Sequence, residues 1–307
     1  GMVGGPFDVE RVERSVGRAY GDGRFDTIDY RLASRDGKAG LELVPRQKPW
    51  TAFAKFGLQL DDNFNGSSSY MISAELTFHD VNRLGGKWRN LIQLGRVSGL
   101  RTEFRQPFGD GGAFFLRPAL ELRSESLPLM SESLEQLAEY RVVRRGASLE
   151  AGFSPVPSWR VAASLVAGKD KGQRVIGDPA AFPTQEETYA GVRMGATFDT
   201  LDSVSFPTTG LRADIEYLSL QPWGDANVEG DVARISVDWA HSWERYHLLL
   251  GGRLASALDP GVNYQSQTFL GGFLNMSGFA ERALVDRQAA LARAVFYRRT
   301  GDTSRVF

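Results

Sequence analysis

Residues 70–78 read YMISAELTF, and every second side chain in this stretch is apolar. The same alternation occurs in residues 112–124, 190–198 and 211–217. Because successive side chains of a β-strand point to opposite faces of a sheet, each stretch predicts a strand with one apolar and one polar face. A shift of one residue would move charged side chains to the apolar face, so the register of these strands is strongly constrained.

Twelve strands of this kind are predicted after residue 49. They cover roughly residues 50–60, 70–78, 87–97, 99–107, 112–124, 137–154, 159–168, 190–198, 211–217, 231–243, 246–256 and 288–298. Many alternate for about ten residues, enough to cross a bilayer at a tilt, whereas strands of soluble sheets usually run about five or six. We therefore expect a mainly β fold, a transmembrane antiparallel β-barrel whose apolar side chains face lipid and whose polar side chains line the interior.

Composition narrows the class of protein further. The 307 residues carry 36 basic and 37 acidic side chains, a balance that argues against a nucleic-acid partner. They contain no cysteine, which excludes a disulfide scaffold and a thiolate-ligated zinc site. No run of about 18 apolar residues occurs, so a transmembrane helix is not expected.

The predicted connections and aromatic residues fit a barrel that crosses a membrane. Long connections at 125–136, 169–185, 221–230 and 257–287 mostly alternate with short ones, which is typical of the two rims of such a barrel. Five of the six tryptophans fall near predicted strand ends, where an aromatic girdle meets the lipid headgroups. These are Trp50, Trp88, Trp159, Trp223 and Trp243.

Two regions depart from simple alternation. Within 137–154 the apolar parity changes between Val142 and Ala147, which we interpret as one long strand with a β-bulge near Gly146. Residues 8–20 instead have apolar side chains at helical spacing, and two short extended runs, 25–32 and 40–45, follow around Asp36-Gly37. The front of the chain therefore predicts a small α+β module.

Several stretches resemble the BamA-like outer-membrane superfamily (bacterial surface antigen). Residues 199–210, DTLDSVSFPTTG, look like its periplasmic turn, with the motif residues Asp199, Phe206, Pro207 and Gly210. Residues 269–279, FLGGFLNMSGF, are similar to its sixth extracellular loop, which folds back into the lumen. The loop-six motif residues here are Gly271, Gly272, Ser277, Gly278 and Phe279. Residues 20–25, YGDGRF, and 48–50, KPW, resemble the end of a polypeptide-transport-associated (POTRA) domain.

The resemblance implies a domain organisation. Ser277 stands where the superfamily usually has an arginine before Gly-Phe, and this departure resembles the branch in which a patatin-like lipase precedes one POTRA domain and a barrel. On this reading, residues 1–48 are the C-terminal part of a POTRA domain. Residues 49–307 are then a C-terminally truncated barrel with about 12 of an expected 16 strands.

The resemblance also implies a function. It indicates a translocator in the outer membrane of a Gram-negative bacterium, with its POTRA part in the periplasm, that secretes or inserts protein and displays an N-terminal patatin-like lipase. The expected partners are outer-membrane lipid, an extended polypeptide client or the chain's own passenger, and the barrel-assembly machinery. The alternatives are a passive pore, or a structural barrel that anchors other domains without a client.

The polar strand faces supply the remaining candidate residues. Arginines recur there, and either they form a positively lined conduit or neighbouring carboxylates neutralise them, as the net charge of −1 favours. The charges expected in the lumen are Arg117, Glu121, Arg193, Arg212, Asp214 and Glu216. For loop six, we weigh a gating plug anchored by Phe279 equally against a loop that only fills space.

No catalytic, cofactor or metal site is predicted. Residues 61–66 begin like a calcium loop, but the twelfth position is Ile72 where a bidentate glutamate is needed. Residues 168–172, GKDKG, lack the order of a phosphate-binding loop and predict a solvated loop. The histidines His79, His241 and His247 show no metal-ligand spacing, and no nucleophile elbow occurs, so the chain itself is not expected to be an enzyme.

Overall fold

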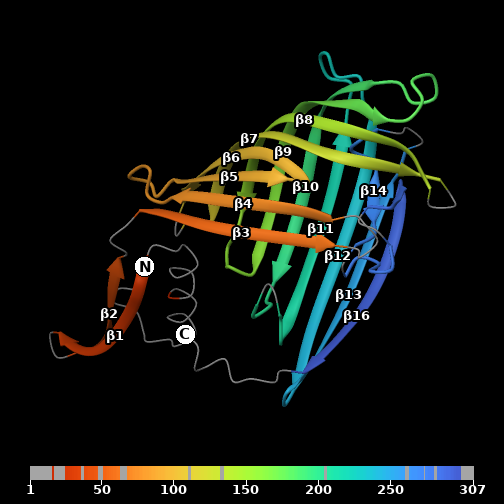
Figure 1. Ribbon diagram of the computed structural model, residues 1–307. Coiled ribbons are helices and arrows are strands. Elements are labelled where there is room, and N and C mark those ends of the chain that lie inside the picture. The colour runs from red at the N-terminus through yellow and green to blue at the C-terminus, as the bar shows by residue number, and fades with distance from the viewer. Residues whose placement is uncertain are drawn as a thin grey trace.

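The computed structural model describes most of the chain after residue 24 (Figure 1). The described residues are 16, 25–35, 38–47, 51–62, 68–109, 112–131, 135–203, 206–259, 263–272, 274–279 and 282–298. The helix predicted at 8–20 lies outside them except for Val16, and so does most of the calcium-like loop after Asp62. Among the described residues, no helix is both long and apolar enough to span a bilayer.

Twelve antiparallel strands form one sheet, and they confirm all twelve predicted strands. The strands are β3 (Ala52–Asp62), β4 (Ser68–Phe78), β5 (Lys87–Gly95), β6 (Val97–Phe108), β7 (Phe114–Met130), β8 (Gln136–Phe153), β9 (Trp159–Ile176), β10 (Gln185–Asp199), β11 (Gly210–Leu220), β12 (Gly230–Trp243), β13 (Tyr246–Ala257) and β16 (Gln288–Arg298). Each strand pairs with the next, and within the described residues β3 and β16 form the two edges of the sheet.

Two hairpins stand outside this sheet. β1 (Phe25–Arg35) and β2 (Lys38–Gln47) pair with each other, which confirms the two N-terminal strands. The predicted Asp36-Gly37 turn lies outside the described residues. β14 (Thr268–Leu270) and β15 (Leu284–Asp286) form a short second hairpin between β13 and β16.

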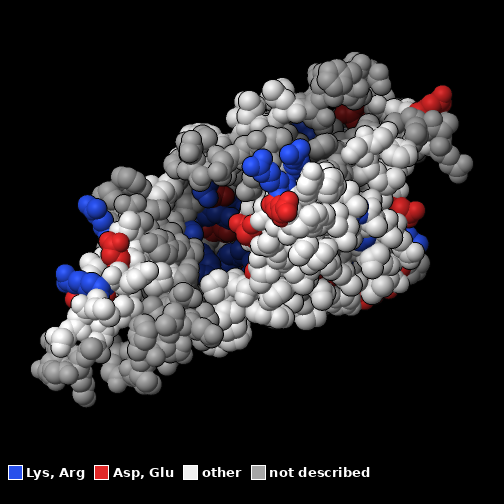
Figure 2. Space-filling model, turned by 90° about the horizontal axis from the view of Figure 1, so that it is seen from below, with Lys and Arg blue, Asp and Glu red and all other residues white. Residues whose placement is uncertain are grey.

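The two faces of the main sheet differ in chemistry as the alternation predicts. The apolar row of β4 is open to the surroundings, with Tyr70 58% and Ile72 48% exposed, and Leu165 on β9 is 56% exposed. The charged side chains gather inside the hollow of the curved sheet, while the outer surface in the same view is mostly uncharged (Figure 2). Apolar rows that face outward are what a barrel in lipid requires.

The outer face of β9 shows the height of the apolar belt. Alternate residues from Trp159 to Ala167 are apolar, and the next outward residues are Lys169 and Lys171. Eight residue steps of about 3.4 Å, tilted by about 40°, rise by roughly 21 Å. This height is close to the apolar band of about 25 Å found in outer-membrane barrels.

The β-bulge predicted near Gly146 is wrong. Glu121 pairs with Gly146, and Gly146 pairs with Gly168, and neither ladder shifts its register there. The register shifts lie at Leu129/Met130 and at Glu139/Tyr140, and even-numbered residues of β8 face inward from Ala138 onward. What changes is their chemistry, because inward Tyr140 and Val142 are apolar and buried at one end of the strand. The apparent change of parity is therefore a change of environment.

The loop predicted at 168–172 is also wrong, because these residues lie in the middle of β9. The register pairs Asp170 with Arg144 of β8 and with Glu187 of β10, so the backbone forms ladders on both sides. Lysines 169 and 171 point outward, while Asp170 is fully buried. A solvated loop could not hold a carboxylate in that position.

Candidate functional site

The inner face of the sheet carries a network of ion pairs. Most of these arginines reach carboxylates on the same or a neighbouring strand, and Arg293 of β16 reaches across β13 to Asp238 of β12, so most positive charge is compensated nearby. The pairs are Arg89–Glu103 at 2.8 Å, Arg101–Glu121 at 2.9 Å, Arg117–Glu150 at 2.8 Å, Arg193–Glu216 at 3.6 Å, Arg212–Asp214 at 2.8 Å, Arg234–Glu216 at 2.9 Å and Arg293–Asp238 at 2.6 Å. All six predicted lumen charges take part in these pairs.

Residues 258–287, which we call the inner segment, connect β13 to β16 and contact this inner face. Their first contact is a tight turn at 263–266. The side-chain oxygen of Asn263 accepts hydrogen bonds from the backbone amides of Gln265 and Ser266, both at 2.9 Å. Ser266 Oγ accepts a hydrogen bond from the Asn263 amide at 3.0 Å. The turn therefore has a fixed shape of its own.

Three strands of the sheet hold this turn. Gln265 Nε2 donates to Asp170 of β9 at 2.9 Å, and the Gln265 carbonyl accepts a hydrogen bond from Arg234 of β12 at 2.8 Å. The Tyr264 amide donates to Glu187 of β10 at 2.9 Å. These contacts join residues up to 95 positions apart in the sequence. The turn is thus fixed by the wall of the sheet.

Asp170 is the centre of this contact. Its side chain is 0% exposed and accepts two hydrogen bonds from Arg144, both at 3.0 Å. A buried carboxylate is tolerated only when it is paired and hydrogen-bonded, and Arg144 with Gln265 provides both conditions. Asp170 therefore couples the strand ladder to the inner segment.

An apolar cluster surrounds the same turn. Leu127, Ala138, Tyr140 and Val142 are buried on the inner face of β7 and β8. Tyr264 and Phe269 of the inner segment pack against them, together with Phe182. Burial, and next the negative charge of Glu187, raise the pKa of Tyr264 to about 12. The phenol is consequently neutral at physiological pH.

A second contact lies at Arg282. Its guanidinium pairs with Glu125 of β7 at 2.6 Å and lies 5.0 Å from the centre of the Phe269 ring. Arg123 pairs with the same carboxylate at 2.8 Å. Ser277 Oγ accepts a hydrogen bond from the Leu274 amide at 3.1 Å within its own turn. The described ion pair between the inner segment and β7 is made by Arg282.

The predicted loop-six motif residues lie at the tip of the inner segment. Gly271 and Gly272 have φ angles of 117° and 97°, which favour glycine, and their amides donate to the carbonyls of Asn275 and Phe279. Ser277 and Gly278 are exposed, and Phe279 is half-buried. Phe279 therefore contributes to the internal turn of the tip. In the same stretch, the Asn275 side-chain oxygen accepts a hydrogen bond from Arg253 of β13 at 3.5 Å, and the Leu274 carbonyl accepts one from Arg293 of β16 at 3.4 Å. The described contacts with the wall thus lie at residues 263–266, at 274–275 and at Arg282.

The predicted turn at 199–210 is ordered by its aspartates. Asp202 accepts hydrogen bonds from the backbone amides of Thr208 and Thr209 and from the Thr208 hydroxyl. Slight burial acts in the opposite direction, yet these bonds hold the pKa of Asp202 below its usual value. Asp199 accepts a hydrogen bond from the Leu201 amide at 3.0 Å, and Gly210 has a φ of 111°.

This turn, which connects β10 to β11, contacts β16, which lies three strands away from β11 in the order of the sheet. The Tyr297 hydroxyl of β16 donates to the Pro207 carbonyl at 2.7 Å, and the Phe206 ring lies 6.2 Å from the Tyr297 ring. Buried His247 of β13 stacks on Tyr297 at 4.8 Å. The four predicted turn residues are thus close together, and the turn contacts edge strand β16, which the sequence did not predict.

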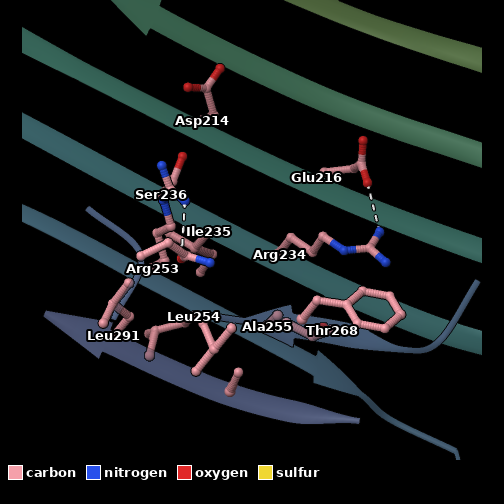
Figure 3. Close-up of a pocket in the computed structure, with 14 residues that line it drawn as sticks. Asp214, Glu216, Arg234, Ile235, Ser236, Arg253, Leu254, Ala255, Thr268 and Leu291 are labelled. Atoms are coloured by element: carbon pink, nitrogen blue, oxygen red, sulfur yellow. Dashed lines mark hydrogen bonds and ion pairs between the residues drawn. The ribbon is translucent and has the colours of Figure 1, made fainter. Parts of the chain in front are cut away.

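A cavity of about 390 Å³ separates the inner segment from β11–β13 and β16. Asp214, Glu216, Arg234 and Arg253 line it together with Thr268 and Phe269. Figure 3 shows Arg234 directed at Glu216, with Asp214 on the adjoining part of the wall. Charges of both signs and free polar groups could contact an extended peptide here.

The three histidines lie on aromatic neighbours. His79 contacts the Phe53 ring at 5.2 Å, and His241 lies between Trp239 and Trp243. Within the ranges that the structure describes, no group of three or more His, Cys, Asp or Glu side chains could hold a metal ion. Each of the three histidines thus packs against an aromatic ring.

Comparison with known proteins shows similarity in structure without detectable similarity in sequence. No protein-family model matches the chain, and no curated protein matches it significantly. BamA from Haemophilus ducreyi lacking POTRA domains 1-3 is similar with a TM-score of 0.66 at 15% identity, over 92% of this chain and 56% of that one.

Two CdiB structures give the same result. CdiB from Acinetobacter baumannii has a TM-score of 0.67 at 11% identity, over 99% of this chain and 57% of its own. CdiB from Escherichia coli has a TM-score of 0.64 at 12% identity, over 98% of this chain and 58% of its own. The chain thus spans less than two thirds of the length of these proteins. The predicted fold class is confirmed, because the twelve-stranded sheet has the fold of the BamA and CdiB β-barrels.

Proposed function

We propose that this chain belongs to an outer-membrane translocator that secretes or inserts protein. The observation that carries the proposal is a sheet of the BamA and CdiB type whose hollow contains a segment held by polar contacts. Hydrogen bonds and ion pairs of this kind fix one position yet can exchange for water or for a client. The inner segment is therefore suited to act as a gate.

The proposed mechanism is strand addition. An edge strand presents N–H and C=O groups that can pair with an incoming extended chain. Within the described residues the β1–β2 hairpin offers such edges. Residues 1–48, as the end of a periplasmic POTRA domain, would receive the client before the barrel does.

Support for a particular passenger and for a particular route of insertion comes from the sequence resemblance alone. On that basis we propose an N-terminal patatin-like lipase as the passenger, with membrane insertion by the barrel-assembly machinery and no catalysis by these 307 residues. A catalytic Gly-x-Ser-x-Gly elbow upstream of residue 1 in the parent gene would agree with this passenger. A parent gene without an upstream hydrolase would contradict it.

A reversible lock on the inner segment tests the proposal. These 307 residues contain no cysteine, so Glu125→Cys and Arg282→Cys can be joined by a cleavable bifunctional thiol reagent in the full-length protein. We expect surface display of the passenger to stop when the lock forms and to resume after cleavage. The two single-cysteine variants, treated identically, serve as controls. Display that continues at the normal rate with the lock complete would contradict gating by this segment.

The transport claim itself has a separate test. Depletion of the full-length protein is expected to abolish display of its N-terminal domain or the assembly of other barrels. If both remain normal, a passive pore or structural barrel is the better reading. Conductance of the purified protein that does not change after deletion of residues 266–287 would point to the same alternative.

A further inference from the structure

A hollow on the outer face of β7–β10 has no role in the function proposed above. Its volume is about 680 Å³, and an adjoining hollow of about 690 Å³ continues it towards Trp88. Ala147, Ala167 and Ala190 are directly paired across β8, β9 and β10 and form its floor. Leu120 and Trp223 form its walls. The small alanine side chains between larger ones create the depth.

Basic residues stand at one end of this hollow. The next outward row of the sheet pairs Leu122 with Arg145, Arg145 with Lys169 and Lys169 with Thr188. Arg145 and Lys169 line the hollow directly, and Lys171 lies one outward position farther along β9.

One carboxylate lies among these three cations. Glu186 contacts Lys169 and, at 3.9 Å, Lys171, and it also interacts electrostatically with Arg145. No described residue forms an ion pair with Arg145. Asp225 lines the hollow beside Trp223, so three positive charges face two negative ones. The cluster thus keeps positive charge, and Arg145 is available to an anion.

The position of this cluster is at the border of the apolar belt. Outward residues from Trp159 to Ala167 of β9 are apolar, and the next three outward residues are Lys169, Lys171 and Gln173. The border lies towards the rim at which β13 ends and residues 258–287 begin, and on the proposed outer-membrane location this rim is the cell-surface side. A molecule that occupies the hollow there must have an apolar part against alanines and an anionic part against arginine and lysine.

We propose that the hollow binds a phosphorylated glycolipid of the outer leaflet, the lipid A type of molecule. One acyl chain lies along the alanine row between Leu120 and Trp223, and a sugar phosphate contacts Arg145 and Lys169. This site rests on the proposed outer-membrane location, but not on protein transport.

Lipid binding to the purified full-length protein tests the site. Native mass spectrometry in detergent with added lipid A would measure affinity for wild type and for the double variant Arg145→Gln/Lys169→Gln. Each basic side chain near an anionic surface contributes about 1 kcal/mol, so we expect affinity to fall about 30-fold. Arg245→Gln, an exposed arginine at the opposite rim, is the matched control and should bind as wild type does.

Two further measurements keep the proposal falsifiable. Ala167→Leu fills the floor while leaving both cations in place, and it should also weaken binding of lipid A. Phosphatidylglycerol should bind wild type more weakly than lipid A does, because it has one phosphate and fewer chains. Equal binding of the two lipids, or unchanged lipid A affinity in the double variant, would overturn the site. Neither result depends on whether secretion is observed.

Discussion

The same strands meet two environments, and their chemistry inverts between them. From Trp159 to Ala167, the outward residues of β9 are all apolar, and its inward residues are mixed, with polar Arg160 and Ser164 beside apolar Ala162 and Val166. Beyond that border Lys169 and Lys171 point outward. There the inner face of the neighbouring β8 carries the buried Tyr140 and Val142, against the inner segment. The first part has the pattern of a barrel in lipid, and the second part has the pattern of a water-soluble sheet with a packed core.

The two parts of these strands show that the period of two in the sequence and the choice of which face is apolar carry different information. A period of two identifies a strand in any solvent, because it follows from backbone geometry. Which of the two faces is apolar depends on what lies against each face. Where lipid lies outside and water inside, the outward face is apolar. Where water lies outside and a packed segment lies inside, the inward face is apolar. One uninterrupted strand can therefore show both.

The largest effect is expected from Asp170→Ala, which disrupts the part of the sheet that packs against the inner segment. It leaves Arg144 without its carboxylate and removes the acceptor of Gln265. Loss of one partner of a buried pair costs about 3–5 kcal/mol. Unfolding in urea, followed by tryptophan fluorescence of the protein in micelles, measures this loss. Lys171→Ala, on the adjacent outward position, should change the free energy of unfolding by less than about 0.5 kcal/mol. Equal losses in the two variants would contradict the assigned faces.

A smaller effect is expected from an arginine in the apolar belt. Leu165→Arg places a charge on the outer face near the middle of the belt, which costs about 2–4 kcal/mol in a barrel strand. Ser124→Arg also places a charge on the outer face of the sheet, but on β7 and beyond the border of the apolar belt, where water is expected. It should cost about 0.5 kcal/mol or less. Folding equilibria in lipid vesicles give both values. If Ser124→Arg is as costly as Leu165→Arg, the border is misplaced.

A hydroxyl in the packed part should have a still smaller effect. Val142→Thr keeps the shape of a side chain that is 2% exposed but buries a polar group among Leu127, Ala138 and Tyr140. Burial of an unpaired hydroxyl costs about 1–3 kcal/mol in proteins. Val143→Thr, the outward neighbour, should be nearly neutral. Urea unfolding compares the two variants, and a neutral Val142→Thr would mean that water reaches this face.

The sequence predicted every strand of the main sheet because alternation is local and long. It also predicted the lumen charges, since arginine and carboxylate side chains cannot face lipid on a strand such as β11. It misassigned residues 168–172 because lysine, aspartate and glycine together are typical of loops, and only the ladders with β8 and β10 show that they form a strand. The bulge near Gly146 was wrong for a related reason, since the covering of Tyr140 and Val142 comes from residues more than a hundred positions away.

The candidate site was predicted less completely than the fold. The resemblance pointed to Gly271–Phe279, where Leu274 and Asn275 contact the wall, but it did not indicate Asn263–Ser266 or Arg282. An Asn-x-x-Ser turn is a local signal that could have been noticed. Its partner Asp170 lies 95 residues away from Gln265, and no spacing rule connects the two.

Ionisation of Tyr264 gives the smallest effect and sharpens the comparison most directly. Its pKa is raised to about 12, first by burial and then by Glu187, whereas a tyrosine in an unfolded chain titrates near pH 10. Between about pH 10 and 12 the folded protein thus binds more protons than the unfolded one, so stability falls as pH rises through this window. Tyr264→Phe should lose this part of the pH dependence, and the phenolate absorbance of wild type should show one late-titrating tyrosine that the variant lacks. A phenol in a water-filled lumen would titrate earlier, and identical profiles for the two proteins would mean that the inner segment does not pack against the apolar wall of β7 and β8.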